Sequence, residues 1–379
     1  MNKILLRLSG TWFAAAALFV FVCAALPAQS VKFSGIFDSK LTLNFKQDGE
    51  AAAGIEEFAN FRLESGIKDK AVFFAAFNAI VLSGLMAESV QSGGGFVIGE
   101  SYAAALELER LYFRANGGIF DVEAGLKRLA FGFGQVFAPS DFLNSRNPLF
   151  PDARPRAVLA GSCEFYPNDS IIIEPFVSTS KNPFYSNGTG AVAGISGIYN
   201  NSSAYMETFY AFEAGENSNN IHRVGFSFKT DIVIGFWVDA LYLFVQQLNM
   251  NETGLSFSAG ADYSFFNGKC YTLFEYMWSG SSSVTAKTKK NIYGFEGQNY
   301  LYGVFRFNFN DWTNASAACL AALDNFSCTP ILSVEYGLFQ GFTLVFQTQV
   351  SVAKESDAEF SPEKTKTLCT ANIKARMRF

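Results

Sequence analysis

Residues 31–45 read VKFSGIFDSKLTLNF and alternate between two kinds of side chain. The odd positions are apolar or small except for one serine: Val31, Phe33, Gly35, Phe37, Ser39, Leu41, Leu43 and Phe45. The even positions are polar except for one isoleucine: Lys32, Ser34, Ile36, Asp38, Lys40, Thr42 and Asn44. Successive side chains of a β-strand point to opposite faces, so this period predicts a long strand with one apolar and one polar face.

A strand of this length and pattern is typical of a membrane-spanning barrel. A tilted strand of about 9–11 residues already crosses a bilayer. Its polar face is then expected to meet water in the lumen rather than a packed core. In hydrocarbon every backbone donor and acceptor must be paired within the protein, and among sheets only a closed barrel achieves this.

The end of the chain repeats the pattern over residues 369–379. Apolar or small residues fill its odd positions: Cys369, Ala371, Ile373, Ala375, Met377 and Phe379. Polar residues fill its even positions: Thr370, Asn372, Lys374, Arg376 and Arg378. A last strand that ends on Phe379 resembles the assembly signal of bacterial outer-membrane barrels. The resemblance implies that the barrel-assembly machinery is a partner.

Between these ends, short turns alternate with longer polar connections. The short turns are expected at residues 68–70, 116–118, 167–170, 200–202, 230–231, 267–268, 310–313 and 339–341. The long connections are expected at residues 46–54, 88–103, 134–156, 178–189, 215–220, 246–253, 280–298, 324–327 and 353–364. We therefore expect an all-β fold, a transmembrane antiparallel β-barrel of about 16–18 strands with both chain ends on the short-turn side. Residues 71–87 carry no charge and could form a short membrane helix, but a strand preserves the alternation of turns.

Composition agrees with a barrel in the outer membrane of a bacterial cell. Charged residues make up 17% and aromatic residues 16% of the chain, with 42 phenylalanines. A soluble protein would need a very large core to hold them, whereas a barrel turns them toward lipid and the interfaces. Interfacial girdle positions are expected for eight residues: Tyr112, Tyr166, Tyr205, Trp237, Tyr263, Trp278, Tyr300 and Tyr302. The net charge of −5 argues against nucleic acid as a partner.

Residues 1–28 have the features of a signal peptide, which leaves residues 29–379 as the barrel. Lys3 and Arg7 precede an apolar stretch, and cleavage is expected after Ala28. Losing both cations would change the net charge from −5 to −7. Cys23 suggests a lipoprotein as an alternative, although Val22 is large for that type of cleavage site.

The remaining cysteines do not form a metal-binding pattern. Cys163, Cys270, Cys319, Cys328 and Cys369 are scattered, so no metal site and no cofactor are expected. Cys319 and Cys328 flank a short connection and could form a disulfide. The simpler interpretation is that all five are small apolar residues of the wall.

The third long connection differs from the rest. Residues 129–156 read LAFGFGQVFAPSDFLNSRNPLFPDARPR and follow no strand or helix period. This region resembles large porin-like outer-membrane proteins, in which a hairpin leads into a Gly/Pro-rich loop. The matching residues are Gly125, Lys127, Arg128, Gly132, Phe133, Gly134, Pro139, Asp141, Asn147 and Pro148. Phe131 stands where such proteins often carry Trp. The resemblance implies a channel for small solutes in which residues 134–156 bend inward as a constriction.

Charge in this region suggests a role in selectivity. The candidate constriction residues are five bases and two acids, a local charge of +3: Lys127, Arg128, Arg146, Arg154, Arg156, Asp141 and Asp152. On residues 120–126 the even positions are apolar and expected to face lipid, which turns Asp121, Glu123 and Lys127 toward the lumen. Basic side chains in a narrow pore favour anions. Alternatively, the bases pair with nearby carboxylates and only hold the loop in place.

Enzymatic activity is not indicated. His222 is the single histidine, and although Ser218 or Ser227 could partner it, no G-x-S-x-G motif surrounds them. The expected function is passive diffusion of small hydrophilic solutes, with outer-membrane lipid around the barrel and the oligomeric state open, a homo-oligomer included. One alternative is a substrate-specific channel for an apolar compound, which an apolar interior at Ile36 or Phe58 would favour. Another is a surface-exposed structural or adhesin barrel without an open pore.

Overall fold

A computed structural model gives the architecture of the chain. It describes residues 30–67, 70–88, 90, 97–99, 101–144, 148–149, 157–184, 190–214, 220–246, 251–280, 291 and 293–379. The expected signal peptide lies outside the described residues. None of the described helices has the length and apolar character needed to cross a membrane.

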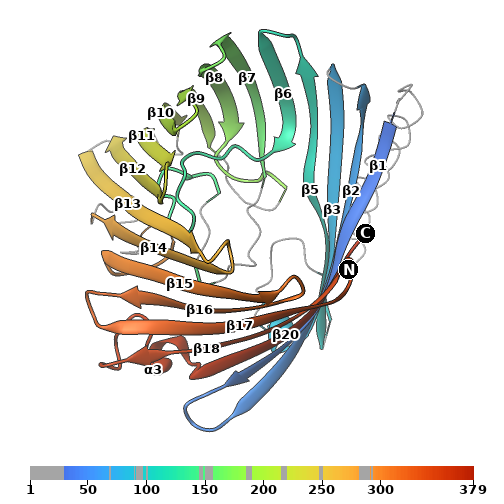
Figure 1. Ribbon diagram of the computed structural model, residues 1–379, viewed down its shortest axis with the longest axis vertical. Helices are drawn as coiled ribbons and strands as arrows, with labels where there is room; N and C mark the ends of the chain where they lie inside the picture. The colour runs from blue at the N-terminus through green and yellow to red at the C-terminus, as the bar shows by residue number, and fades with distance from the viewer. Residues whose placement is uncertain are drawn as a thin grey trace.

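Antiparallel strands form a single closed sheet, which Figure 1 shows as a ring. The strands are β1 (Ser30–Phe45), β2 (Ala51–Ile67), β3 (Ala71–Gly84), β4 (Val97–Ile98), β5 (Tyr102–Asn116), β6 (Phe120–Lys127), β7 (Val158–Asn168), β8 (Ile171–Thr179), β9 (Ala191–Asn200), β10 (Ala204–Ala214), β11 (Asn220–Asp231), β12 (Gly235–Gln246), β13 (Asn251–Phe265), β14 (Cys270–Ser279), β15 (Asn299–Asn310), β16 (Thr313–Ala322), β17 (Ser327–Phe339), β18 (Phe342–Val350), β19 (Val352–Ala353) and β20 (Cys369–Arg378). The two-residue strands β4 and β19 lie beside the ring, which leaves a barrel of 18 strands, as the sequence predicted.

The first and last strands close the ring. β1 pairs with β20 from Ile36 opposite Arg378 to Phe45 opposite Cys369. At the end of this seam, Gly35 N donates to Phe379 O at 2.8 Å and Phe379 N donates to Gly35 O at 3.1 Å. The Phe379 ring lies 5.9 Å from that of Phe33 and 6.3 Å from that of Phe61. The terminal residue is therefore part of the closing contact.

Connections alternate between short and long around the whole ring, as expected. The Asn267 turn has positive φ at Asn267 (55°) and Gly268 (82°), in agreement with the Asn-Gly signal. The uncharged segment forms β3, and only its end becomes helical, as the single turn α2 (Leu85–Glu88). A second helical turn, α3 (Pro362–Thr365), lies in the last long connection. The strand interpretation of residues 71–84 is confirmed.

The two faces of the wall differ as the alternation predicts. On β1, Phe33 and Phe37 are 61% and 45% exposed, whereas Asp38 and Thr42 point inward and are buried. Cross-strand register carries the same division around the ring. All five cysteines lie on strands as free thiols, in line with their interpretation as wall residues.

Two adjacent residues of β17 test which face meets lipid. Leu332 is 57% exposed on the outer face, and Ser333 points into the lumen. We expect Leu332→Arg to lower the free energy of unfolding by about 2–4 kcal/mol, the cost of an arginine at the lipid face near the bilayer midplane. Unfolding in lipid vesicles, followed by heat-modifiable migration, measures the effect. Ser333→Arg at the same depth is the control, and equal destabilisation by both would contradict the assignment of faces.

Candidate functional site

The third long connection enters the barrel instead of projecting outward. It leaves the end of β6 and crosses the interior of the ring (Figure 1). We call its described residues, 128–144, 148–149 and 157, the constriction loop. Its partners on the wall are Glu207 on β10, Asp239 on β12 and Glu275 on β14. These residues lie only three to five positions from the short-turn ends of their strands, so the loop reaches deep into the lumen.

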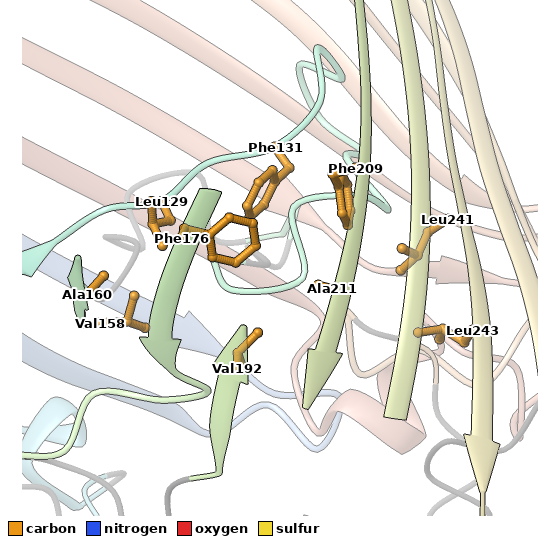
Figure 2. Close-up of a cluster of buried hydrophobic side chains, with 10 residues drawn as sticks. All are labelled: Leu129, Phe131, Val158, Ala160, Phe176, Val192, Phe209, Ala211, Leu241 and Leu243. Carbon is orange, nitrogen blue, oxygen red and sulfur yellow. The ribbon is translucent and has the colours of Figure 1, made fainter. Parts of the chain in front are cut away.

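The first part of the loop packs on an apolar section of the inner wall. Figure 2 shows Leu129 and Phe131 of the loop against inward-facing side chains of β7 to β12, all of them buried. The Phe131 ring lies 4.5 Å from that of Phe209, 5.2 Å from Phe176 and 5.6 Å from Phe142. These contacts bury apolar surface that would otherwise meet water in the lumen, so they hold the loop to one side of the barrel.

Three buried wall carboxylates then bind the loop. Gly132 N donates to Glu207 Oε2 at 2.8 Å. Val136 N and Phe137 N donate to the two oxygens of Glu275 at 2.8 and 3.2 Å. An irregular backbone leaves N–H groups unpaired and a buried carboxylate needs donors, so each group satisfies the other.

Asp239 lies between these two anchors. Its Oδ1 accepts the hydroxyl of Ser140 from the loop and, at 2.5 Å, that of Ser227 from β11. Gly132 passes directly over this carboxylate with φ +84°. A Cβ at Gly132 would lie 2.6 Å from Asp239 Oδ2 and 2.4 Å from Ser140 Oγ. Only glycine therefore fits this crossing, for both the conformation and the close approach.

Two later connections support the other side of the loop. Phe137 packs edge-on against Tyr293, with ring centroids 5.8 Å apart, in a second buried cluster that includes Phe295 and Phe360. Glu359 joins the two connections, because it accepts Glu296 N at 2.9 Å and the hydroxyl of Tyr300 at 2.6 Å. The constriction loop is thus held between the wall and two further loops.

A cavity of about 100 Å³ remains within this assembly. Loop residues between Gly134 and Asn144 line it together with Tyr293. Gln135 at its edge is exposed and donates to Asp262 Oδ2 on β13 at 3.2 Å. The cavity therefore borders the accessible part of the lumen.

The predicted constriction residues have different surroundings. Lys127 is buried, and its Nζ donates to Ser162 Oγ at 2.7 Å and lies 3.5 Å from Glu123. Arg128 turns the other way and donates to Glu109 Oε1 at 2.6 Å. Asp141 accepts Asn144 Nδ2 at 2.8 Å. Arg146, Asp152, Arg154 and Arg156 lie outside the described residues. Lys127 and Arg128 thus have carboxylate neighbours, which agrees with the alternative that the bases only hold the loop in place.

Sequence reasoning did not find the wall carboxylates that hold the loop. The alternation of β10, β12 and β14 does turn Glu207, Asp239 and Glu275 inward, but nothing in the sequence indicates what crosses the lumen to meet them. The girdle assignment was wrong for at least four residues. Tyr205 lies edge-on to Phe133 of the loop, and Tyr302 packs on the buried cluster around Phe137. Trp237 and Tyr300 are fully buried inside the barrel, where Trp237 Nε1 donates to Glu275 Oε1 at 3.1 Å and the Tyr300 hydroxyl binds Glu359.

Removing the Glu275 carboxylate should release the loop. Glu275→Ala leaves two loop amides and the Trp237 indole without their acceptor, and each buried donor left unpaired costs about 1–3 kcal/mol. We expect trypsin to cleave within residues 128–157, which contain several arginines, roughly tenfold faster or more, because about 1.4 kcal/mol corresponds to a factor of ten. Mass spectrometry of the fragments gives the rate.

The matched control is Glu335→Ala. Glu335 also points into the lumen, from β17, but binds Asn314 on the neighbouring strand rather than the loop. Equal cleavage rates in the two variants would rule out Glu275 as an anchor.

Comparison with known proteins places the fold. No protein-family model matches the chain, and no curated protein sequence is similar to it. Among solved structures, OccAB1 of Acinetobacter baumannii is similar with a TM-score of 0.61 and 9% identity, over 93% of this chain and 98% of that one. OccK2 of Pseudomonas aeruginosa has a TM-score of 0.60 and 8% identity over the same shares. A BenF-like porin from Pseudomonas fluorescens Pf-5 has a TM-score of 0.59 and 8% identity, over 93% and 99%. At such identities the likeness concerns architecture, and the chain has the porin-like, 18-stranded antiparallel barrel fold seen in Occ channels.

Proposed function

We propose that this protein is a channel of the bacterial outer membrane through which small hydrophilic solutes diffuse, with a preference for anions that carry a carboxylate. The observation that carries the proposal is the loop bound inside the barrel. It narrows the lumen from one side, since its wall anchors lie on β10 to β14. An enzyme is not proposed. His222 lies on β11 with Tyr210 as its hydrogen-bond partner and Phe212 and Phe244 around it, whereas Ser227 on the same strand binds Asp239.

The charges of the lumen are divided between its two sides. Loop amides and hydroxyls bind the carboxylates of β10, β12 and β14, so these acids have no need of basic partners. Halfway around the ring from β12 lies β2, which carries Arg62 on its inner face. Arg62 Nε donates to Asn60 Oδ1 at 2.6 Å, and among the described residues no carboxylate forms an ion pair with it. Such an arginine favours a passing anion.

The strands beside β2 add further bases, although with acidic partners. Arg376 on β20 binds both oxygens of Asp38 at 2.8 Å, and Lys40 on β1 lies 2.7 Å from Glu56. A basic wall opposite an acidic, loop-covered wall sets a transverse field across the lumen. A second structure of OccK2 contains glucuronate, a carboxylate-bearing solute, at a TM-score of 0.58 and 7% identity to this chain. That example supports the same class of solute here.

The alternative of an apolar solute has less support. Phe58 does point inward, but it is 3% exposed. The apolar inner faces of β7 to β12 are buried under the constriction loop (Figure 2). This apolar surface stabilises the loop and is not available to a solute that passes through the lumen. The adhesin alternative predicts no conductance at all.

Reversal potentials test the anion preference. Across a planar bilayer with a KCl gradient, we expect the reconstituted protein to give stepwise currents. The reversal potential should have the sign of the equilibrium potential of chloride rather than that of potassium. Arg62→Ala should lower the chloride-to-potassium permeability ratio roughly twofold to fivefold, since a charge about 4 Å from a hydrated ion is worth about 1 kcal/mol in water. Lys269→Ala, in the exposed turn between β13 and β14, removes the same charge as a control. A cation-selective wild-type channel would overturn the proposed preference.

The loop arginines form a separate test. If Arg146, Arg154 and Arg156 line the constriction, as the sequence predicts, replacing all three by alanine should reduce the anion preference further. If the three side chains only hold the loop, the permeability ratio will stay at the wild-type value while tryptic cleavage elsewhere in the loop increases.

A further inference from the structure

Arg62, the arginine proposed above to favour anions, is held by an uncharged side chain. Its Nε donates to Asn60 Oδ1 at 2.6 Å, and its two Nη groups have no hydrogen-bond partner among the described residues. Arg376 on the same wall, by contrast, binds both oxygens of Asp38 at 2.8 Å. Arg62 is therefore fixed in place without loss of its charge.

Asn60 is itself buried and fixed from the other side. It is 2% exposed, and its Nδ2 donates to Asn78 Oδ1 on β3 at 2.7 Å and to Glu109 Oε2 on β5 at 2.6 Å. Both of these oxygens are acceptors, so they orient the amide and turn its Oδ1 toward Arg62. The reverse orientation would place Oδ1 against the Glu109 carboxylate and Nδ2 against the N–H of Arg62.

The charge of Glu109 is compensated by bases. Its Oε1 accepts Arg128 Nη2 at 2.6 Å and lies 3.6 Å from Arg110 Nε. Two bases around one acid leave a net positive charge here, even before Arg62 is counted. Glu109 therefore holds Asn60 in place, while the surroundings of Arg62 stay basic.

A guanidinium held in this way is prepared for an anion. Arg62 has five N–H donors, and the bond to Asn60 uses only the one on Nε. The edge formed by the two Nη groups keeps its parallel N–H donors, which suit an anion with two oxygens. A long side chain that is already ordered also loses less conformational entropy when an anion binds.

We propose that Asn60 is a positioning residue for the passage of anions: it holds Arg62 through Nε, leaves the Nη edge available to the solute, and does not cancel the charge. This role rests on the proposed channel function and deepens it, since Asn60 acts on the solute only through Arg62. An amide suits the position, because a carboxylate of the same shape would form an ion pair with Arg62.

A double-mutant cycle separates positioning from a purely structural role. Asn60→Ala, Arg62→Ala and the double variant of the full chain are reconstituted in planar bilayers, and reversal potentials in a KCl gradient give the chloride-to-potassium permeability ratios. We expect Asn60→Ala to lower the ratio roughly twofold, the lower end of the effect of ordering one long side chain, because the charge stays and only its position is lost. In the Arg62→Ala background the same substitution should change nothing.

Asn314→Ala is the matched control. Asn314 also lies on the inner face and donates to a glutamate, Glu335, at 3.0 Å, but among the described residues no arginine binds it. This variant should keep the wild-type permeability ratio. Heat-modifiable migration shows whether each variant is folded.

Asn60→Asp is a second variant, of nearly the same shape as the wild type, in case Asn60→Ala does not fold. The new carboxylate would pair with Arg62, so we expect a larger loss of anion preference than for Asn60→Ala. Ser333→Asp adds the same charge to the inner face of β17, away from Arg62, and its effect should be smaller.

The results separate the two proposals. If wild-type protein prefers anions and Asn60→Ala keeps that preference, or lowers it equally with and without Arg62, the positioning role is overturned while the channel stands. Equal effects of Asn60→Asp and Ser333→Asp overturn the positioning role as well. If wild-type protein gives no KCl current, the channel itself is overturned and the role of Asn60 with it.

Discussion

The rest of the structure depends on closure of the hydrogen-bond ladder between β1 and β20. In a bilayer an open sheet edge would expose a row of unpaired backbone groups, each at a cost of several kcal/mol, so the first strand must find the last. The seam runs from Ile36 to Phe45 and ends in the reciprocal bonds of Gly35 and Phe379. Closure also means that no second sheet packs on the inner face. Side chains of the constriction loop pack on part of this inner face instead, so the connections determine the shape of the lumen.

A loop inside the lumen, like an open sheet edge, has backbone groups without a neighbouring strand to pair with. Its backbone has no ladder to join, so its amides need other acceptors. Glu207 and Glu275 provide them, and Gly132 allows the backbone to pass over Asp239. Apolar contacts around Phe131 stabilise the loop but do not fix its orientation. The carboxylates fix the positions of individual amides, because hydrogen bonds are directional. Buried acids on three alternate strands therefore place an irregular segment with the precision of regular structure.

The wall could be predicted from the sequence because its rule is local. Period-two alternation in β1 and β20, turn residues such as Asn267 and Gly268, and the order of short and long connections each depend on a few neighbouring residues. The contacts of the loop are not local. Glu275 lies about 140 positions from Val136 in the chain, and alternation says only that it points inward. The error at Trp237 has another cause. Trp237 shares its face of β12 with Asp239, so the alternation already turned it inward, and only its aromatic character suggested a girdle.

The division of charge follows from the way the loop is held. A carboxylate that accepts loop amides is buried and close to the backbone, so it acts weakly on a solute that passes on the other side of the lumen. Arg62 faces that side without an ion pair among the described residues, and Asn60 separates it from the Glu109 carboxylate. The chain as a whole is acidic, at −5, so the proposed anion preference has to rest on the positions of the charges rather than on their sum. Under this proposal the acids that anchor the loop are occupied by its amides and hydroxyls, whereas the bases on the opposite wall face the open part of the lumen.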